Sequence, residues 1–259
     1  MNATLARNWP EYFMEAAGLG IFMLSAGGFA IVLFHPASAV TLAIADPLTR
    51  RVLMGAAMGL TAVALIYSPW GQRSGAHFNP AVTLTFLRLG KIAAPDAFFY
   101  VMAQLIGGVL GIGAVALVSG GLLAHPAVNY VVTVPGAAGV PGAFIAELGI
   151  SLALMSVVLA VSNAPRFARY TGVVAGVLIA TYIVFEGPIS GMSMNPARSL
   201  ASAVAADLWT AFWVYVTAPL LGMLLAAELH LRLSPRPVHC AKLHHDNRHR
   251  CIFRCGYAR

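Results

Sequence analysis

A motif built around Asn-Pro-Ala occurs twice in this chain, and it limits the possible folds more than any other feature. Residues 74–84 and residues 190–200 both follow the pattern S-G-x-x-x-N-P-A-x-x-L. The two Asn residues, Asn79 and Asn195, lie 116 positions apart. Asn is a preferred N-cap residue, and Pro is favoured at the first helical position, where its missing N–H costs nothing. Each copy therefore predicts the start of a helix.

Both motifs open apolar segments that are too short to cross a membrane alone. One segment covers residues 81–89 and the other covers residues 197–206. Nine or ten helical residues rise about 15 Å, which is half of a roughly 30 Å hydrocarbon core. Two half-helices that meet end to end would therefore span the bilayer together. The loops that precede them would lie at membrane depth, where non-helical backbone must be buried in protein or line a wet cavity.

The rest of the chain has the composition of a membrane protein. It is 59% hydrophobic and 10% charged, whereas soluble domains carry about 25% charged residues. A helix needs roughly 20 mostly apolar residues to cross the hydrocarbon core. The first apolar stretch lacks a small-residue cleavage site and is expected to remain as a span. Six candidate spans are predicted, at residues 12–34, 52–69, 97–119, 143–162, 171–185 and 208–231.

The spans divide into two similar halves. Each half has three spans, one half-length segment and one buried acid, Glu15 in the first span and Glu147 in the fourth. Repeats with an odd number of spans insert with opposite topology, as in many transport proteins. We therefore expect an all-α membrane protein with six transmembrane helices, two re-entrant half-helices and an inverted repeat. The expected parts are an N-terminus (1–10), a channel domain (11–232, with repeats at about 11–119 and 141–232) and a tail (233–259).

The formal charge of +7 comes mostly from the tail, where residues 233–259 hold six basic residues and one acid. After six spans, attraction to anionic lipid headgroups explains this charge better than nucleic-acid binding does. Basic residues in the tail and in residues 163–170 predict cytoplasmic termini, although Arg50 and Arg51 run against the rule. All three cysteines lie in the tail, but their spacing matches no Cys-x-x-Cys pair. We expect a disordered basic tail, and neither a metal site nor a cofactor.

These motifs, together with residues 100–108, resemble the aquaporin family of water and glycerol channels over about residues 11–232. The resemblance implies a passive channel that is not an enzyme, with one pore per subunit in a homotetramer embedded in the lipid bilayer. It also implies water and small uncharged solutes as partners, and no nucleic acid. It identifies the pore motifs as Asn79, Pro80, Ala81, Asn195, Pro196 and Ala197.

The resemblance also assigns roles around the motifs. Two helix N-termini, each with roughly +0.5 charge, would repel cations and hydronium at the pore centre. Glu15, Glu147 and His77 are expected to support the loops. For the two acids, an interhelical contact without a role in the loops is the alternative, since buried ionisable groups in membranes nearly always find partners.

The expected filter is unusual. The resemblance implies a filter of four positions, and counting from the motifs places them at Arg198, Met192 and Ile183, and at either Met58 or Gly59 in the second span. Water-specific members carry an aromatic residue and a His at two of these positions. Gly59 would leave room for a small polyol, whereas flexible Met side chains could close the filter again. Ser199, in contrast, matches the water type, because glycerol-type members carry Asp there.

We therefore predict a passive water channel that excludes ions and protons. A channel for glycerol or another small uncharged solute is the alternative, and an ion-coupled secondary transporter is the remote one. No nucleotide loop, nucleophile elbow or spaced set of metal ligands occurs among the spans, so no enzyme activity is expected. The compact length and short loops indicate a bacterial inner membrane.

Overall fold

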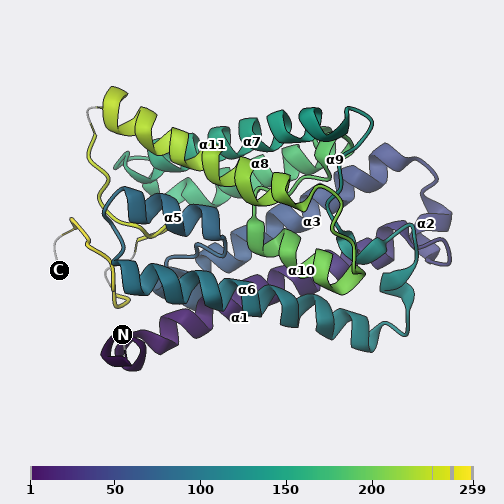
Figure 1. Ribbon diagram of the computed structural model, residues 1–259, viewed down its shortest axis with the longest axis horizontal. Coiled ribbons are helices and arrows are strands. Elements are labelled where there is room, and N and C mark those ends of the chain that lie inside the picture. The colour runs from purple at the N-terminus through teal and green to yellow at the C-terminus, as the bar shows by residue number, and fades with distance from the viewer. Residues whose placement is uncertain (1, 235, 246–247, 258–259) are drawn as a thin grey trace.

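The structure, a computed structural model, describes residues 2–234, 236–245 and 248–257, and within them it contains helices and no strand. Six helices are long and apolar enough to cross a membrane. In the case of α8, the membrane-spanning length also includes the short 3-10 helix before it, residues 168–170. The six helices pack side by side along the long axis of the molecule (Figure 1). The predicted fold class is confirmed. The six are α1 (Asn2–Phe34), α3 (Pro47–Tyr67), α6 (Ala94–Val118), α7 (Gly139–Ser162), α8 (Thr171–Phe185) and α11 (Phe212–Leu233).

The two predicted half-helices are present as α5 (Pro80–Arg88) and α10 (Pro196–Ala206). Each follows a short helix, α4 (Pro69–Ser74) or α9 (Gly187–Ser190), and a left-handed Gly that ends it. Both begin where the motif predicts, because each Asn is the N-cap and each Pro is the first helical residue. The remaining elements are short: α2 (Ala39–Ala43), η1 (Leu122–Ala124), η2 (Asn129–Val131) and η3 (Ala168–Tyr170).

Helix contacts repeat between the two halves. α1 packs against α6 in the first half, and α7 packs against α11 in the second. The half-helices exchange partners, since α5 lies against α11 of the second half and α10 lies against α6 of the first. α3 and α8 pack across the boundary between the halves. This exchange explains why the two half-helices point at each other in the middle of the bundle.

Glycines allow these helices to approach closely. A Cβ added at Gly107 of α6 would lie 2.0 Å from the Ala16 carbonyl oxygen of α1. In the second half, a Cβ at Gly222 of α11 would lie 2.4 Å from the Leu148 carbonyl oxygen of α7. Small residues at such contacts let helix backbones pack in lipid, where the hydrophobic effect does not drive association.

We therefore expect Gly107→Ala to destabilise the bundle by about 1–3 kcal/mol, because a backbone carbonyl cannot move aside as a side chain can. Gly113→Ala is the matched control, since Gly113 lies in the same helix with no atom within 4 Å of an added Cβ. The measurement is the thermal midpoint of monodisperse protein in detergent, followed by size exclusion. Equal midpoints for the two variants would contradict a close α1–α6 contact at Gly107.

The N-terminal segment differs from its prediction. Helix α1 begins at Asn2 and not near residue 12. The Asp96 carboxylate of α6 accepts hydrogen bonds from the Asn8 amide at 2.7 Å and from the Tyr12 hydroxyl at 2.6 Å. These polar partners hold the first turns of α1 against the bundle. Residues 1–10 are therefore not a separate segment over the part that the structure describes.

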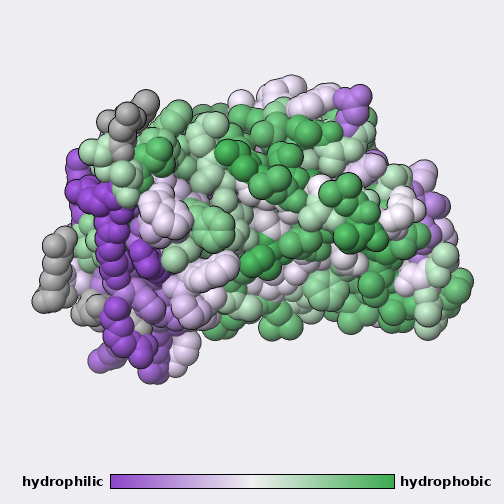
Figure 2. All heavy atoms as spheres, turned by 90° about the horizontal axis from the view of Figure 1, so that it is seen from below, coloured by the Kyte–Doolittle hydropathy of each residue, from purple (hydrophilic) through white to green (hydrophobic). Residues whose placement is uncertain are grey.

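The tail also differs from its prediction. Its described residues fold onto the end of the bundle at which α1 begins (Figure 1). Cys240, Ala241, Leu243 and Phe253 are buried there. Figure 2 shows hydrophilic residues gathered at this end and hydrophobic residues covering the middle of the molecule, as a membrane protein requires. The expectation of a disordered tail is wrong for residues 236–245 and 248–257, because apolar side chains are inserted between the helix ends.

Candidate pore and selectivity filter

Each Asn of the repeated motif caps its half-helix. The Asn79 side-chain oxygen accepts a hydrogen bond from the Ala81 N–H at 2.8 Å. The Asn195 oxygen accepts from the N–H groups of Ala197 at 3.1 Å and Arg198 at 3.3 Å. Each Pro occupies the first helical position. The local motif therefore builds the helix start that the sequence predicts.

The two caps also join the loops to each other. The Asn79 side-chain NH₂ donates to the Met194 carbonyl at 2.7 Å, and the Asn195 NH₂ donates to the Phe78 carbonyl at 2.8 Å. Each NH₂ group has two hydrogens, so one donor per amide remains after the loop contact. The crossed hydrogen bonds place both amides at the junction of the two half-helices.

Glu15 holds the first loop. Its carboxylate accepts hydrogen bonds from the Ser74 hydroxyl at 2.7 Å and from the N–H groups of His77 at 3.1 Å and Phe78 at 2.6 Å. The Gln104 amide of α6 donates a fourth at 2.8 Å. The Glu15 side chain is completely buried, so these donors replace the water that would otherwise satisfy it.

Glu147 repeats this arrangement in the second loop. It accepts from the Ser190 hydroxyl at 2.6 Å, and from the N–H groups of Ser193 and Met194, both at 2.7 Å.

A buried Tyr hydroxyl adds one more hydrogen bond to each loop. Tyr100 donates to the Ser74 carbonyl, and Tyr215 donates to the Ser190 carbonyl. The two acids therefore fix loop backbone, which a plain interhelical contact would not do.

The loops need this support because their backbone is strained. Four non-glycine residues have positive φ angles at equivalent positions of the two loops: Ala76 (56°), Phe78 (46°), Met192 (50°) and Met194 (53°). The left-handed region costs an L-residue roughly 1–2 kcal/mol. Such conformations persist only where the surroundings over-determine them, and they cluster at functional sites.

A cavity of about 480 Å³ runs past both motifs. Seven of the predicted site residues line it: Met58, His77, Asn79, Ile183, Met192, Asn195 and Arg198. Arg198 contributes a buried Nη1 that has no hydrogen-bond partner among the described residues. An unpartnered buried donor beside a cavity is available to water or solute.

Gly59 is the exception. A Cβ added at Gly59 would lie 2.5 Å from the Gly176 carbonyl oxygen of α8, so this position faces the α3–α8 contact and not the cavity. Met58 lines the cavity in its place. Adjacent helical residues differ by about 100° in direction, so the assignment of Gly59 as a pore residue is wrong.

Met54 is a lining residue that sequence reasoning missed. Gly55 lies against Ala180, and Gly59 lies against Gly176, so α3 and α8 run antiparallel. Ile183 is therefore closer along the axis to Met54 than to Met58. The spacing of four between the two Met residues, which places them on one helix face, is the signal that could have found it.

Comparison with known proteins identifies the family. The model of the major intrinsic protein family matches residues 4–230. The chain belongs to the major intrinsic protein family. It is 38% identical over 184 residues to a probable NIP-type aquaporin of Nicotiana alata, covering 70% of this chain and 66% of that protein. It is 34% identical over 183 residues to aquaporin NIP1-1 of Zea mays, covering 70% of this chain and 63% of that protein.

The chain thus spans slightly less than two thirds of the length of these relatives. The fold is shared with the X-ray structure of the aquaglyceroporin from Plasmodium falciparum, at a TM-score of 0.70 and 23% identity, covering 86% of this chain and 96% of that one. This major intrinsic protein is an integral multi-pass membrane protein. The relatives are plant proteins, so the expected bacterial inner membrane finds no support.

The tail of this major intrinsic protein reaches one end of the cavity. Leu243 lines the cavity, and its N–H donates to the Gly75 carbonyl at 3.1 Å. The His77 ring contacts the Ala241 carbonyl at 2.8 Å and stacks on the Phe253 ring at 5.4 Å between centroids. His77 therefore links the first loop to the tail as well as lining the cavity.

Proposed function

We propose that this protein is a passive channel for water and small uncharged solutes, with the described cavity as its pore. The observation that carries this proposal is the convergence of both helix N-termini, both Asn amides and Arg198 on one cavity. Glu15 and Glu147 use their oxygens on the loops, so we do not assign either of them as an ionisable coupling site. Flux should therefore rise linearly with the solute gradient and be independent of a proton gradient.

Exclusion of protons follows from the same geometry. One remaining donor on each of Asn79 and Asn195 can bind the oxygen of a single water. That water then points its hydrogens away along the file and cannot relay a proton through its own oxygen. Two helix N-termini of roughly +0.5 charge each, and the guanidinium of Arg198, add repulsion of cations.

Passage of glycerol-sized solutes is the second candidate function, and the residues that line the cavity support it. Met54, Met58, Ile183 and Met192 give the cavity an apolar, largely flexible lining, and two arginines, Arg198 and Arg51, line the same cavity. An apolar wall accepts the carbon backbone of a polyol, and thioether side chains adapt to its shape. The neighbours named as aquaglyceroporin and NIP-type aquaporin agree with this second candidate.

The test is stopped-flow light scattering of liposomes under sucrose and glycerol gradients. We expect Met58→Ala to raise glycerol permeability relative to water, because truncation removes three heavy atoms from a lining position. Leu60→Ala is the matched control: Leu60 lies on the same helix but is 68% exposed on the outside of the bundle. An unchanged ratio for Met58→Ala would remove Met58 from the filter, and no flux of either solute in the unaltered protein would refute the channel.

Two further features belong to this proposal. Basic residues at the end that carries the tail favour a cytoplasmic location for both termini. The resemblance to aquaporins favours a homotetramer with one pore in each chain. Chemical crosslinking in native membranes and protease access from each side are the measurements for these two features.

A further inference from the structure

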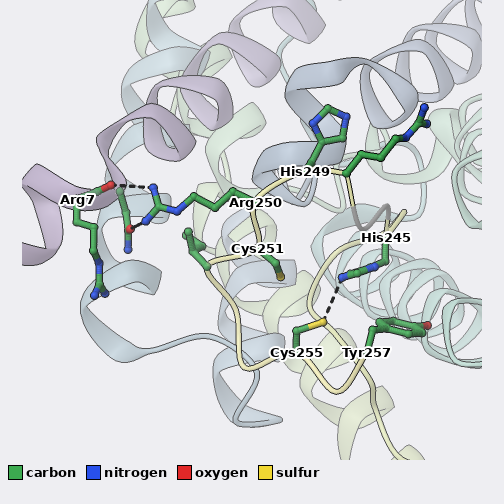
Figure 3. Close-up of a pocket in the computed structure, with 10 residues that line it drawn as sticks. Arg7, His245, His249, Arg250, Cys251, Cys255 and Tyr257 are labelled. Carbon is green, nitrogen blue, oxygen red and sulfur yellow. Dashed lines mark hydrogen bonds between the residues drawn. The ribbon is translucent and has the colours of Figure 1, made fainter. Parts of the chain in front are cut away.

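Four metal-ligating side chains meet in the tail. Sulfur atoms of Cys240, Cys251 and Cys255 and a ring nitrogen of His245 all lie within 4.8 Å of one another. Figure 3 shows the His245 ring directed at the Cys255 sulfur. The sequence spacing of these four residues matches no paired Cys motif, so the cluster is created by the path of the chain.

The distances suit a tetrahedral ion. With Zn–S of about 2.3 Å and Zn–N of about 2.0–2.1 Å, a tetrahedral site requires S···S edges of about 3.8 Å and S···N edges of about 3.6 Å. The Cys240 and Cys251 sulfurs lie 3.6 Å apart, and the Cys255 sulfur lies 3.1 Å from His245 Nε2. Shifts of less than about 1 Å in the side chains would bring all four donors to one centre.

The donor set and its surroundings select the metal. Three thiolates and one imidazole form a closed set of the kind that holds structural Zn²⁺. Such a site carries one net negative charge, and the Lys242 ammonium is a nearby cation. Lys242 is held in place by the carbonyls of Gln72 at 2.8 Å and Arg250 at 2.9 Å.

The described tail residues need a source of stabilisation such as a bound metal ion. Residues 236–245 and 248–257 form neither helix nor strand, yet Cys240 is only 4% exposed and Phe253 is also buried. A segment this short, without regular hydrogen bonding, rarely offsets its own loss of conformational entropy. In structural sites, metal binding supplies that free energy.

We propose that Cys240, His245, Cys251 and Cys255 bind one Zn²⁺, and that this ion holds the tail as a cover over the inner end of the pore. The second half of the proposal follows from the loops between the donors. Leu243, which lines the cavity, lies between Cys240 and His245. Phe253, which stacks on His77, lies between Cys251 and Cys255. Fixing the four donors therefore fixes both covering side chains.

Metal content tests the first half. Full-length protein purified in detergent without added metal, and then dialysed, should retain about one Zn²⁺ per chain by mass spectrometry. Cys251→Ser should weaken retention by at least about 100-fold, since metal affinity depends on each thiolate ligand. His249→Ala is the matched control, because His249 is in the tail but is not among the four donors.

Added Co²⁺ provides a second readout, since thiolate ligation produces intense near-ultraviolet absorption and a tetrahedral visible band. Loss of Zn²⁺ from the unaltered protein on dialysis, or equal retention by Cys251→Ser, would overturn the site. A count of one free thiol in the denatured protein, in place of three, would also overturn the site, because it would indicate a disulfide such as Cys240–Cys251.

Water flux tests the second half, which rests on the proposed function. Treatment of reconstituted protein with a Zn²⁺ chelator should raise water permeability several-fold, and Leu243→Ala should raise it with Zn²⁺ content unchanged. Unchanged permeability in both would overturn the cover. If Zn²⁺ is retained while no flux occurs with or without chelator or tail variants, the channel function fails and the metal site stands.

Discussion

Glu15→Ala is expected to give little folded protein and no water flux. The substitution removes the acceptor of four buried donors from Ser74, His77, Phe78 and Gln104. Each buried donor left without a partner costs about 1–3 kcal/mol, and whole domains are stable by only about 5–15 kcal/mol. The same bonds hold Phe78 at positive φ, so the loop would also lose the constraint on its strained backbone.

Two further variants test this explanation. Glu15→Gln keeps one carbonyl acceptor and should retain part of the folded yield. Glu228→Ala is the matched control, since Glu228 pairs with Arg88 at 2.6 Å with both side chains partly exposed, and such pairs contribute about 0–1 kcal/mol. Yield is measured by size exclusion from equal membrane amounts, and flux by stopped flow. Full yield and full flux of Glu15→Ala would show that the first loop does not depend on its carboxylate.

Arg198→Ala is expected to weaken the exclusion of protons and cations and to admit larger neutral solutes. Arg198 lines the cavity beside both Asn residues of the repeated motif, and Arg51 is the other arginine among the lining residues. A unit charge 4 Å from an ion at an effective dielectric of about 20 contributes about 4 kcal/mol. Its removal should therefore raise proton leak by orders of magnitude from a low base. The lost side-chain volume should also raise glycerol and urea permeability.

Proton leak is measured with a pH-sensitive dye inside liposomes, alongside water and urea flux. Arg169→Ala is the matched control, because Arg169 is an exposed residue that stacks on Tyr170 outside the cavity. A proton leak equal to that of the unaltered protein would show that the half-helix N-termini exclude ions without help from Arg198. In that case the charge of Arg198 would not be part of the barrier.

Local chemistry explains why the half-helices could be predicted. Asn followed by Pro makes a helix start from neighbouring atoms alone, and the structure shows Asn79 and Asn195 as caps that accept hydrogen bonds from the N–H groups of Ala81 and Ala197. Glu15 and Glu147 could be predicted from the sequence as well, because a carboxylate inside an apolar span must meet hydrogen-bond donors. Duplication then indicated that the second half would repeat the first, as Glu147 does.

Register between helices could not be obtained this way. Met58 and Gly59 are neighbours in sequence. Counting back from the first motif reaches one or the other, depending on whether the loop between them and the motif is one residue longer than usual. Only the packing of Gly59 against Gly176 decides which of them faces the cavity, and the same contact brings Met54 into the lining. The tail depended on tertiary structure even more, since its donors have no recognisable spacing.

The order of amino acids was enough to predict six spans, two capped half-helices, two buried acids and the family to which the chain belongs. These follow from hydropathy and from contacts within a few residues, which the order of amino acids specifies directly. Two features required the folded structure: the face of α3 that lines the cavity, and the path of the tail, which reaches one end of the cavity and gathers Cys240, His245, Cys251 and Cys255. Those outcomes depend on steric fit between segments far apart in the chain, and such fit is a property of three-dimensional packing.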